Sequence, residues 1–306
     1  MANVIVEEAY LSNIAAAIRS KNYQSQMRYY PSQMAGIING IPPLRLSMST
    51  IPTMSYSRAV TGSVTVFGYT TFANQSGVHV LCLPDCTELA SSTFKSCYDL
   101  TAAILPKCST LGSSAFYACT SLSLVVLSEC TGIGANAFYG CDIRELSLPR
   151  CQTIGDFAFY QNSNLDSINL PACQTIGVSA FDWCPISGTV SLPECLTIAS
   201  HAFRSCSMQA LTLPKCQYIG SYALDCCHYL SEVNLPGSSV CSIGSMPFPY
   251  SISESMRITV PSGMLSDYLA QTNWHRYYQA LFDTNGEWGG DYYTPPESGD
   301  YYSVSS

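Results

Sequence analysis

The sequence predicts a repeat solenoid in which each coil of 21 or 22 residues contributes one short parallel strand. The main observation is a period, because an aromatic or aliphatic residue recurs with gaps of 22, 22, 21, 22, 22 and 21 residues. The recurring positions are Phe94, Phe116, Phe138, Phe159, Phe181, Phe203 and Leu224. A unit of this length cannot bury its apolar face alone, so neighbouring coils must stack around one continuous core.

The second observation is the pattern inside each unit, which opens with a short alternating run such as Leu146-Ser147-Leu148-Pro149. Apolar residues at a spacing of two indicate a strand with one face inward, and proline, which has no N–H, ends the ladder. In Ile154-Gly155 the glycine suits a positive φ or a close backbone approach. Ala158-Phe159 then fills the far side. Each coil is therefore predicted to be a strand, a turn, a compact second half and a return.

Two cysteines stand 11 residues apart in most units, and Asn162 replaces the second one in the unit that begins with Cys151. The pairs are Cys86/Cys97, Cys108/Cys119, Cys130/Cys141, Cys173/Cys184, Cys195/Cys206 and Cys216/Cys227. Buried cysteine behaves as a small apolar residue, and an asparagine could not preserve a disulfide. We therefore predict buried, reduced thiols. Disulfides and a zinc site are the alternatives, although zinc ligands usually stand two to four residues apart and the sequence has no CxxC.

The run Leu-Pro-x-Cys-x-x-Ile-Gly-x-x-Ala-Phe-x-x-Cys-x-x-Leu resembles the BspA-type leucine-rich repeat of bacteria. The resemblance covers residues 78–261. It implies a right-handed leucine-rich-repeat solenoid, and it places the chain beside a group that includes many bacterial surface and secreted adhesins.

Residues 1–43 are predicted to form a small helical module that attaches the chain to an assembly. Two apolar faces at helical spacing support it, formed by Leu11, Ile14, Ala15 and Ile18, and by Met34, Ile37, Ile38 and Ile41. The segment resembles a short N-terminal module of prophage-encoded tail and structural proteins of Firmicutes, which implies attachment to a phage or phage-tail-like particle. The alternative is a helical cap over an open end of the solenoid.

The remaining boundaries follow from changes in pattern. Residues 44–77 are expected to form a β linker or a degenerate first coil, and residues 78–261 the solenoid. Residues 262–284 are expected to form a helical C-terminal cap, because terminal repeats need a cover. Residues 285–306, rich in Gly, Asp, Tyr, Pro and Ser, are predicted to be a flexible tail.

Composition and charge exclude several classes of function. Charged residues make up 11% of the chain, against about 25% in ordinary domains. The net charge of −8 argues against nucleic acid as a partner. The sequence has no run of 18 apolar residues, so no membrane insertion is expected, and no signal peptide is visible before Tyr10.

Nothing in the sequence has the spacing of a catalytic or cofactor site. The four histidines, His79, His201, His228 and His275, occupy variable positions of the repeat or lie near its ends. No phosphate loop, dinucleotide fingerprint or paired-carboxylate motif appears. We therefore predict no enzyme activity, no cofactor and no metal.

Two columns of the repeat are candidate ligand-binding positions. One is an aromatic strip beside the recurring phenylalanine, comprising Tyr117, Tyr139, Tyr160 and Trp183; tyrosine gives a large, rigid contact area with a polar tip. The other comprises the outward strand residues Ser147, Asn169, Ser191, Thr212 and Asn234. The alternatives are a stacking ladder that only shields the coil, and an ordinary soluble sheet face.

A third column, just before the first cysteine, alternates in charge. It predicts the cross-coil ion pairs Asp85–Lys107, Lys107–Glu129, Glu129–Arg150 and Glu194–Lys215. Exposed pairs contribute only about 0–1 kcal/mol each. Because the signs cancel, we interpret this column as fixing register and not as a ligand stripe.

The sequence thus favours a non-enzymatic surface-recognition or adhesion protein, carried on a phage or phage-tail-like particle. In this interpretation residues 1–43 bind a particle or assembly protein, and the repeat surface binds a bacterial cell-surface protein or glycan. A homo-oligomer is left open. The alternatives are a secreted or surface-anchored bacterial adhesin for host protein or glycan, and a structural decoration or spacer.

Overall fold

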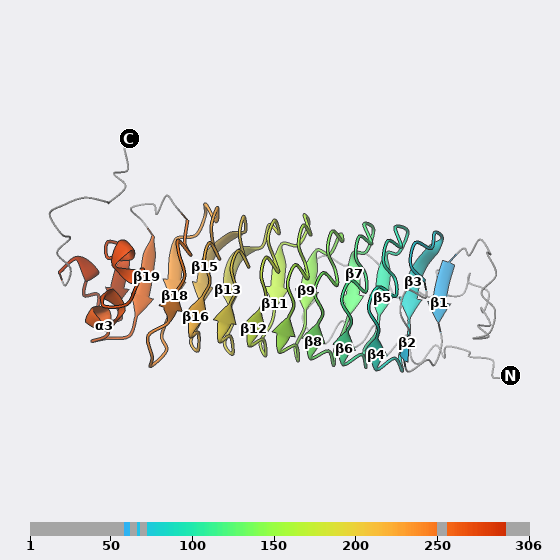
Figure 1. Ribbon diagram of the computed structural model, residues 1–306, viewed down its shortest axis with the longest axis horizontal. Helices are drawn as coiled ribbons and strands as arrows, with labels where there is room; N and C mark the ends of the chain where they lie inside the picture. Colours follow the sequence, from blue (N-terminus) through green and yellow to red (C-terminus); the bar gives the residue numbers. More distant parts are fainter. Residues whose placement is uncertain (1–57, 62–65, 68–71, 250–255, 292–306) are drawn as a thin grey trace.

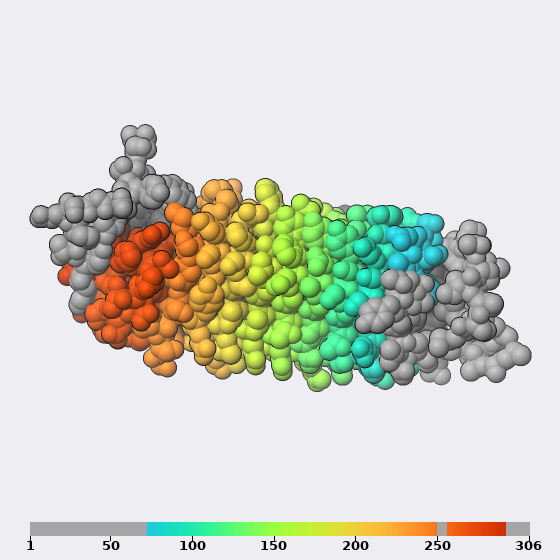
Figure 2. Space-filling model, viewed as in Figure 1, coloured from blue at the N-terminus to red at the C-terminus, as the bar shows by residue number. Residues whose placement is uncertain are grey.

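The computed structural model describes residues 58–61, 66–67, 72–249 and 256–291. The chain winds into a rod, and successive coils form parallel bands across its long axis (Figures 1 and 2). The predicted helical module of residues 1–43 lies outside the described residues. The predicted solenoid fold is confirmed, because every strand-to-strand ladder between coils is parallel.

The first strand of each coil lies on one side of the rod, which we call face A. Hydrogen bonding along face A is interrupted between β7 and β9 and between β11 and β13. The coil between Phe138 and Phe159, which contains β9, is one residue short, and a register shift occurs at Gly188 in β13. The strands of face A are β1 (Arg58–Thr61), β3 (Val78–Cys82), β5 (Ala102–Ile104), β7 (Leu124–Val126), β9 (Glu145–Ser147), β11 (Ser167–Asn169), β13 (Ser187–Ser191), β15 (Ser207–Thr212), β17 (Glu232–Asn234), β19 (Arg257–Val260) and β20 (Leu281–Asp283).

A second strand in each coil, which the sequence analysis does not predict, forms face B. Each is two residues long, which is too short to show a period. From β4 onward each contains the inward Ile or Leu that precedes a Gly or Ala. Together they make one continuous nine-stranded sheet. The strands are β2 (Val66–Phe67), β4 (Glu88–Leu89), β6 (Thr110–Leu111), β8 (Gly132–Ile133), β10 (Thr153–Ile154), β12 (Thr175–Ile176), β14 (Thr197–Ile198), β16 (Tyr218–Ile219) and β18 (Ser242–Ile243).

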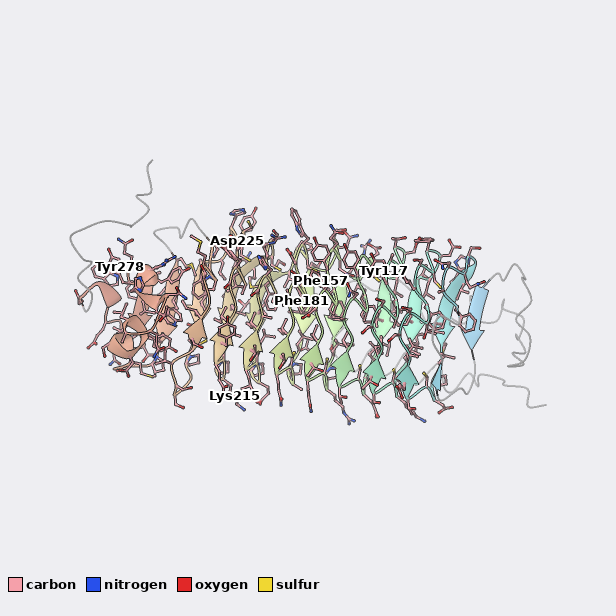
Figure 3. All side chains as sticks on the ribbon, in the orientation of Figure 1. Tyr117, Phe157, Phe181, Lys215, Asp225 and Tyr278 are labelled. Atoms are coloured by element: carbon pink, nitrogen blue, oxygen red, sulfur yellow. The ribbon has the colours of Figure 1, made fainter. Side chains whose placement is uncertain are left out.

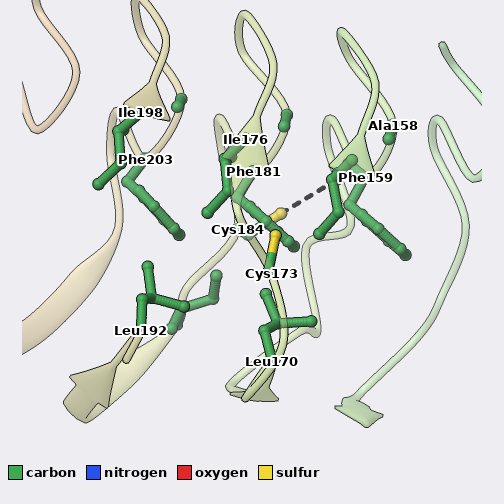
Figure 4. Packing of buried hydrophobic residues seen from close by; sticks show 14 of the residues in the cluster. Ala158, Phe159, Leu170, Cys173, Ile176, Phe181, Cys184, Leu192, Ile198 and Phe203 are labelled. Carbon is green, nitrogen blue, oxygen red and sulfur yellow. Dashed lines mark hydrogen bonds between the residues drawn. The ribbon is translucent and has the colours of Figure 1, made fainter. Parts of the chain in front are cut away.

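The third side of the coil is a six-residue turn that carries the Ala-Phe pair, and we call this side the turn edge. Each phenylalanine N–H donates to the alanine carbonyl of the next coil, as from Phe159 to Ala180 at 2.8 Å. The rings stack along the axis with centroids 5.1–5.7 Å apart, from Phe72 to Phe203. Figure 4 shows three of these rings, Phe159, Phe181 and Phe203, in line beneath the turns. The turn edge is therefore held by both a backbone ladder and an aromatic stack.

The two cysteine columns donate hydrogen bonds to main-chain carbonyls inside the coils. The first cysteine of a coil donates its thiol to the carbonyl two residues later, as from Cys151 to Thr153. The second donates to the phenylalanine carbonyl of the preceding coil, as from Cys184 to Phe159 at 3.0 Å (Figure 4). Asn162 makes the same bond to Phe138 through its amide at 2.8 Å. The columns therefore form hydrogen bonds to the main chain, and none of the sixteen cysteines forms a disulfide.

We expect at most one thiol, that of Cys226, to react with an alkylating reagent in the native protein, because Cys226 alone among the sixteen cysteines is exposed. Burial raises the pKa of Cys97 to about 11 and that of Cys184 to about 12, so the reactive thiolate is scarce. Alkylation without reductant, followed by mass spectrometry, should label nearly all thiols only after unfolding. Several native disulfide pairs in the unreduced protein would contradict this.

In most coils a glycine follows the inward isoleucine or leucine, and it is favoured by close approach and not by a positive φ. Ala90 and Ala199 take this place in two coils. A Cβ on Gly155 would lie 2.7 Å from the backbone nitrogen of Ala135, and one on Gly134 would lie 2.6 Å from that of Ser113. Neighbouring coils therefore meet backbone to backbone at this corner. The positive φ values lie four residues apart within the turn edge, as at Phe157 and Gln161.

The structure describes residues on both sides of the predicted solenoid of residues 78–261. Strands β1 and β2 extend faces A and B by one coil before residue 78. At the other end α3 (Leu265–Leu269) and η1 (Trp274–Tyr277) cover the last coil, where the Trp274 indole donates to the Cys241 carbonyl at 2.6 Å. This cap also contains β20, which pairs with β19. Described structure continues past Asn285 through η2 (Gly289–Asp291), so the predicted tail begins too early.

The charge-alternating column lies on the edge where face A turns into face B. Three of the predicted ion pairs form, Lys107–Asp85 at 2.8 Å, Arg150–Glu129 at 3.8 Å and Lys215–Glu194 at 2.7 Å. All six side chains are substantially exposed, so water screens the pairs. Figure 3 places Lys215 of this column and Asp225 of the turn edge on opposite long edges of the rod.

Candidate ligand-binding surface

The five outward strand residues predicted as ligand contacts lie in one column of face A. Asn169 and Ser191 are exposed, and the others are half-buried. Two neighbours of the column bond to each other, since the Asn169 amide donates to the Ser147 hydroxyl at 3.2 Å. Asn234 instead donates to Glu232 of its own strand at 2.9 Å. The column is interrupted between Asn169 and Ser191, where β11 and β13 are not hydrogen-bonded. It forms a polar surface on face A.

The three tyrosines of the predicted aromatic strip stack as a ladder. Ring centroids are 4.8 Å apart for Tyr117–Tyr139 and 5.0 Å for Tyr139–Tyr160. Lys95 lies over the Tyr117 ring at 5.0 Å. All three tyrosines are half-buried, and burial, followed by the neighbouring tyrosines, raises the pKa of Tyr139. Because the ring faces cover one another, a ligand would meet only ring edges and hydroxyls. The geometry favours the shielding ladder over a contact strip.

The same column changes from aromatic to ionic after Tyr160. Arg204 donates from Nε to both carboxylate oxygens of Asp182 at 3.1 Å, and its other nitrogen Nη2 lies 2.9 Å from Oδ2. Asp182 is 1% exposed, and burial raises its pKa although the guanidinium opposes the rise. A bidentate pair with one partner buried fixes the arginine in a single orientation. Arg204 is thus a rigid element of the surface beside Trp183.

A shallow hollow of about 380 Å³ lies on the turn edge, spanning three coils. It combines two exposed aromatic rings with hydroxyl, imidazole and guanidinium groups. Trp183 is 55% exposed and Tyr229 is 65% exposed, while Arg204 is half-buried and held by Asp182. The lining residues are Trp183, Arg204, Ser205, Cys206, Ser207, Cys226, His228 and Tyr229. The volume falls within the range of small-ligand pockets, roughly 300–1,000 Å³.

Trp183 has a left-handed backbone conformation, as Phe157 and Tyr222 also do in their turns. Its φ is 61°, at a position of the turn where the other coils place Ser96, Ala118, Gly140, Gln161, Ser205 and Cys226. A left-handed conformation costs a side-chain-bearing residue about 1–2 kcal/mol, and bulky residues rarely adopt it. The exposed ring recovers little of this cost by packing. Every coil has a left-handed residue at this position, so the turn geometry imposes the strain, and the exposed tryptophan is what distinguishes this coil.

The predicted site residues are therefore not brought together into one site. Trp183 lies at the hollow, while Tyr117, Tyr139 and Tyr160 lie in the ladder along the same edge. The sequence analysis assigns His228 to a variable surface column and misses Arg204 and Tyr229. A bulky residue in a column of small ones is the signal that would have indicated the position of Trp183. No comparable signal indicates Tyr229, which lies two residues after Cys227.

Metal-binding clusters and membrane-spanning helices are both absent from the described residues. Within them, no group of three or more His, Cys, Asp and Glu side chains could hold a metal ion. His201 stacks on Tyr222 with centroids 5.4 Å apart, which occupies its ring face. No helix in the described part of the chain combines the length and apolar character needed to cross a membrane.

Two parallel-stranded faces, an aromatic stack and a coil of 21 or 22 residues define a leucine-rich-repeat solenoid. Six copies of the BspA type leucine rich repeat region match residues 57–153, 87–197 and 152–268. These ranges cover more than half of the 306 residues, so the chain belongs to this family. The family and the structural neighbours indicate no enzyme class.

Solved structures share the fold at low sequence identity. A leucine rich cell surface protein from Faecalibacterium prausnitzii aligns with a TM-score of 0.50 and 20% identity, covering 68% of this chain and 70% of that one. A leucine-rich repeat protein from Bacteroides ovatus aligns at 0.46 and 18% identity, covering 68% and 63%. The pneumococcal vaccine antigen PcpA aligns at 0.31 and 15% identity, covering 71% and 78%. No curated protein matches the sequence.

Proposed function

We propose that the chain is a non-enzymatic recognition protein of a bacterial cell surface, or a secreted adhesin, that binds a glycan through the hollow at Trp183. The observation that carries the proposal is Trp183 itself, an exposed indole in a left-handed position beside an arginine locked in place. The family supports a binding role, and the F. prausnitzii neighbour is described as a cell surface protein.

The chemistry of the hollow suits a sugar. Exposed Trp and Tyr rings have electron-rich faces that accept the C–H groups of a pyranose. Ser205, Ser207 and His228 surround them with hydrogen-bonding groups that fit hydroxyls. The Arg204 charge is offset by Asp182, so the hollow does not select for a strongly charged ligand. A protein ligand is the second candidate, because Tyr, Trp and Arg also dominate protein interfaces.

A phage or phage-tail-like particle is the less favoured setting. That hypothesis rests on residues 1–43, which lie outside the described residues, and neither the family nor the structural neighbours points to a particle. Fractionation of the producing organism, with an antibody against the solenoid, would separate the two settings. We expect the chain in the cell-surface or secreted fraction, and recovery with particles would restore the phage hypothesis.

Replacing either exposed ring of the hollow should abolish most of the binding. A buried aromatic contact is typically worth about 2 kcal/mol, or roughly 30-fold in affinity, so Trp183→Ala and Tyr229→Ala should each weaken binding by that factor. The measurement is a glycan array and a whole-cell binding screen with the full chain, followed by titration of the strongest ligand. Affinity should change little with salt, because aromatic and hydroxyl contacts are not screened as exposed charges are.

Tyr98→Ala is the matched control, since Tyr98 is 57% exposed on an earlier coil and outside the hollow. It should bind as the unchanged chain does. Equal loss on replacing Tyr117, Tyr139 and Tyr160 together would instead assign binding to the tyrosine ladder. A steep fall in affinity with salt would indicate a charged ligand, and binding to a protein but no glycan would favour the second candidate.

A further inference from the structure

The outward side of face A changes character along the rod. From β9 to β19 the outward positions are mainly hydroxyl, amide and charged residues, such as Ser147, Asn169 and Ser191. On β3, β5 and β7 the same positions are all apolar. These residues, which we call the outer apolar patch, are Val80, Cys82, Ala102, Ile104, Leu124 and Val126.

Two residues of the outer apolar patch, Cys82 and Ile104, are buried although they face away from the core, and the other four are half-buried. Cys82 is 5% exposed and Ile104 is 1% exposed. With Val126 they form a hydrophobic cluster that is separate from the main core. Their inward neighbours Leu81 and Ala103 belong to that core. An outward residue on a sheet becomes buried only when another segment packs on that side of the sheet.

We propose that the N-terminal segment, residues 1–57, packs on the outer apolar patch of this chain's own solenoid. The chain enters the described fold at Arg58, at the start of β1, and β1 is the direct neighbour of β3 in face A. The patch therefore begins one strand away from the end of this segment. The segment is tethered there, which gives it a high effective concentration over the patch.

The apolar content and the length of the segment match the patch. Residues 11–18 and 34–41 each present an apolar face at helical spacing. A helix of about ten residues is roughly 15 Å long at 1.5 Å per residue, and three adjacent strands span roughly 10–15 Å at about 4.8 Å spacing. One helix can thus cross β3, β5 and β7 and end where the outward positions turn polar at β9. In this arrangement the apolar faces of residues 1–43 are occupied by the solenoid and not by a particle protein.

The rate at which Cys82 is alkylated can test the proposal. The Cys82 thiol lies inside the patch, and burial raises its pKa to about 11, so a cover that is removed should make it react faster. In the full chain, Ile14→Ser/Ile18→Ser and Ile37→Ser/Ile38→Ser should each increase native alkylation of Cys82 about tenfold or more, as expected for loss of local protection. Peptide mass spectrometry would follow Cys82 beside Cys108 of the core and the exposed Cys226.

The matched control is Asn13→Ser/Arg19→Ser, on polar positions of the first predicted helix, which should leave Cys82 protected. Cys108 should stay unlabelled and Cys226 labelled in every variant. Labelling of Cys82 as fast as Cys226 in the unchanged chain would overturn the proposal. So would protection that survives both isoleucine variants, and protection that falls on dilution would show that a second copy covers the patch.

A second variant tests the proposal from the solenoid side. Ile104→Asn places an amide where Asn169 and Asn234 stand in later coils, so the coil itself should tolerate it. We expect trypsin to cut after Arg19 and Lys21 at least several times faster in this variant, because the segment is released. Unchanged cleavage together with unchanged Cys82 protection would refute the packing.

Discussion

Replacing Phe159 by alanine is expected to lower the free energy of unfolding by about 3–5 kcal/mol, the usual loss for a buried phenylalanine. Phe159 is fully buried and stacks between Phe138 and Phe181, with ring centroids 5.2 Å away on either side. The substitution therefore removes two ring contacts as well as apolar area. Because each coil contacts only its neighbours, a gap in the middle of the stack should also weaken the coupling between the two halves.

A denaturant titration followed by circular dichroism measures the effect. The matched control is Tyr160→Ala, one residue away on the same turn. Tyr160 is half-buried and touches the rings of Tyr139 and Phe157, so its loss should cost about 1 kcal/mol. A reduced slope of the titration in Phe159→Ala alone would show that the halves unfold separately. Equal losses in the two variants would show that the ring of Phe159 is not the main contact in the stack.

The fold could be predicted because one pattern is repeated in every coil. The fold of any single unit, such as the one around Phe159, is ambiguous from its sequence. The same spacing in successive units predicts stacked coils, because only stacking buries the apolar face of every unit. The two-residue strands of face B could not be predicted, since Thr153-Ile154 is too short to show a period. In most coils a glycine follows the strand, and Gly155, for example, lets neighbouring coils approach backbone to backbone.

The candidate site was far less accessible from the sequence. Column alignment correctly places Tyr117, Tyr139 and Tyr160 on consecutive coils, but it cannot show that their faces cover one another. The hollow is lined by residues from different columns of three coils, among them Trp183, Arg204 and Tyr229. A repeat pattern reports what neighbouring coils share, and this site is made from what they do not share.

The sequence contains a signal for the outer apolar patch, but this signal is easy to overlook. Cys82, Ile104 and Val126 stand in the column where later coils place Ser147 and Asn169. An apolar outward residue on one coil carries little information, because isolated apolar residues are common on protein surfaces. Three on consecutive strands form a contiguous patch, and such patches mark contact sites. Only the burial of Cys82 and Ile104 distinguishes a covered patch from an open one.

Replacing Asn162 by leucine is expected to cost about 2–4 kcal/mol, although the shape of the side chain hardly changes. Asn162 is fully buried and its amide donates to the carbonyls of Phe138 and Phe159, both at 2.8 Å. Its carbonyl accepts the N–H of Ile143 at 3.4 Å. Both phenylalanine carbonyls also accept a backbone N–H, from Cys141 and Asn162 itself. The largest part of the lost stability therefore comes from the Ile143 N–H, whose hydrogen bond is supplied by Asn162.

The asparagine in the cysteine column ends the coil that is one residue short. Leu122 and Leu165, three residues after the column, and Ile186, two residues after it, each donate to the column's backbone carbonyl, but Ile143, which follows Cys141 by two residues, does not. Its N–H turns instead to the next coil, where a thiol could accept it only weakly. Asn162→Cys keeps a donor for Phe138 but loses the acceptor, so it should cost about 1–2 kcal/mol, between wild type and Asn162→Leu. Denaturant titrations of the two variants, with the exposed Asn164→Leu as control at under about 0.5 kcal/mol, would test this order. A cysteine variant as stable as wild type would show that the Ile143 bond contributes nothing, and that the asparagine serves only the Phe138 carbonyl.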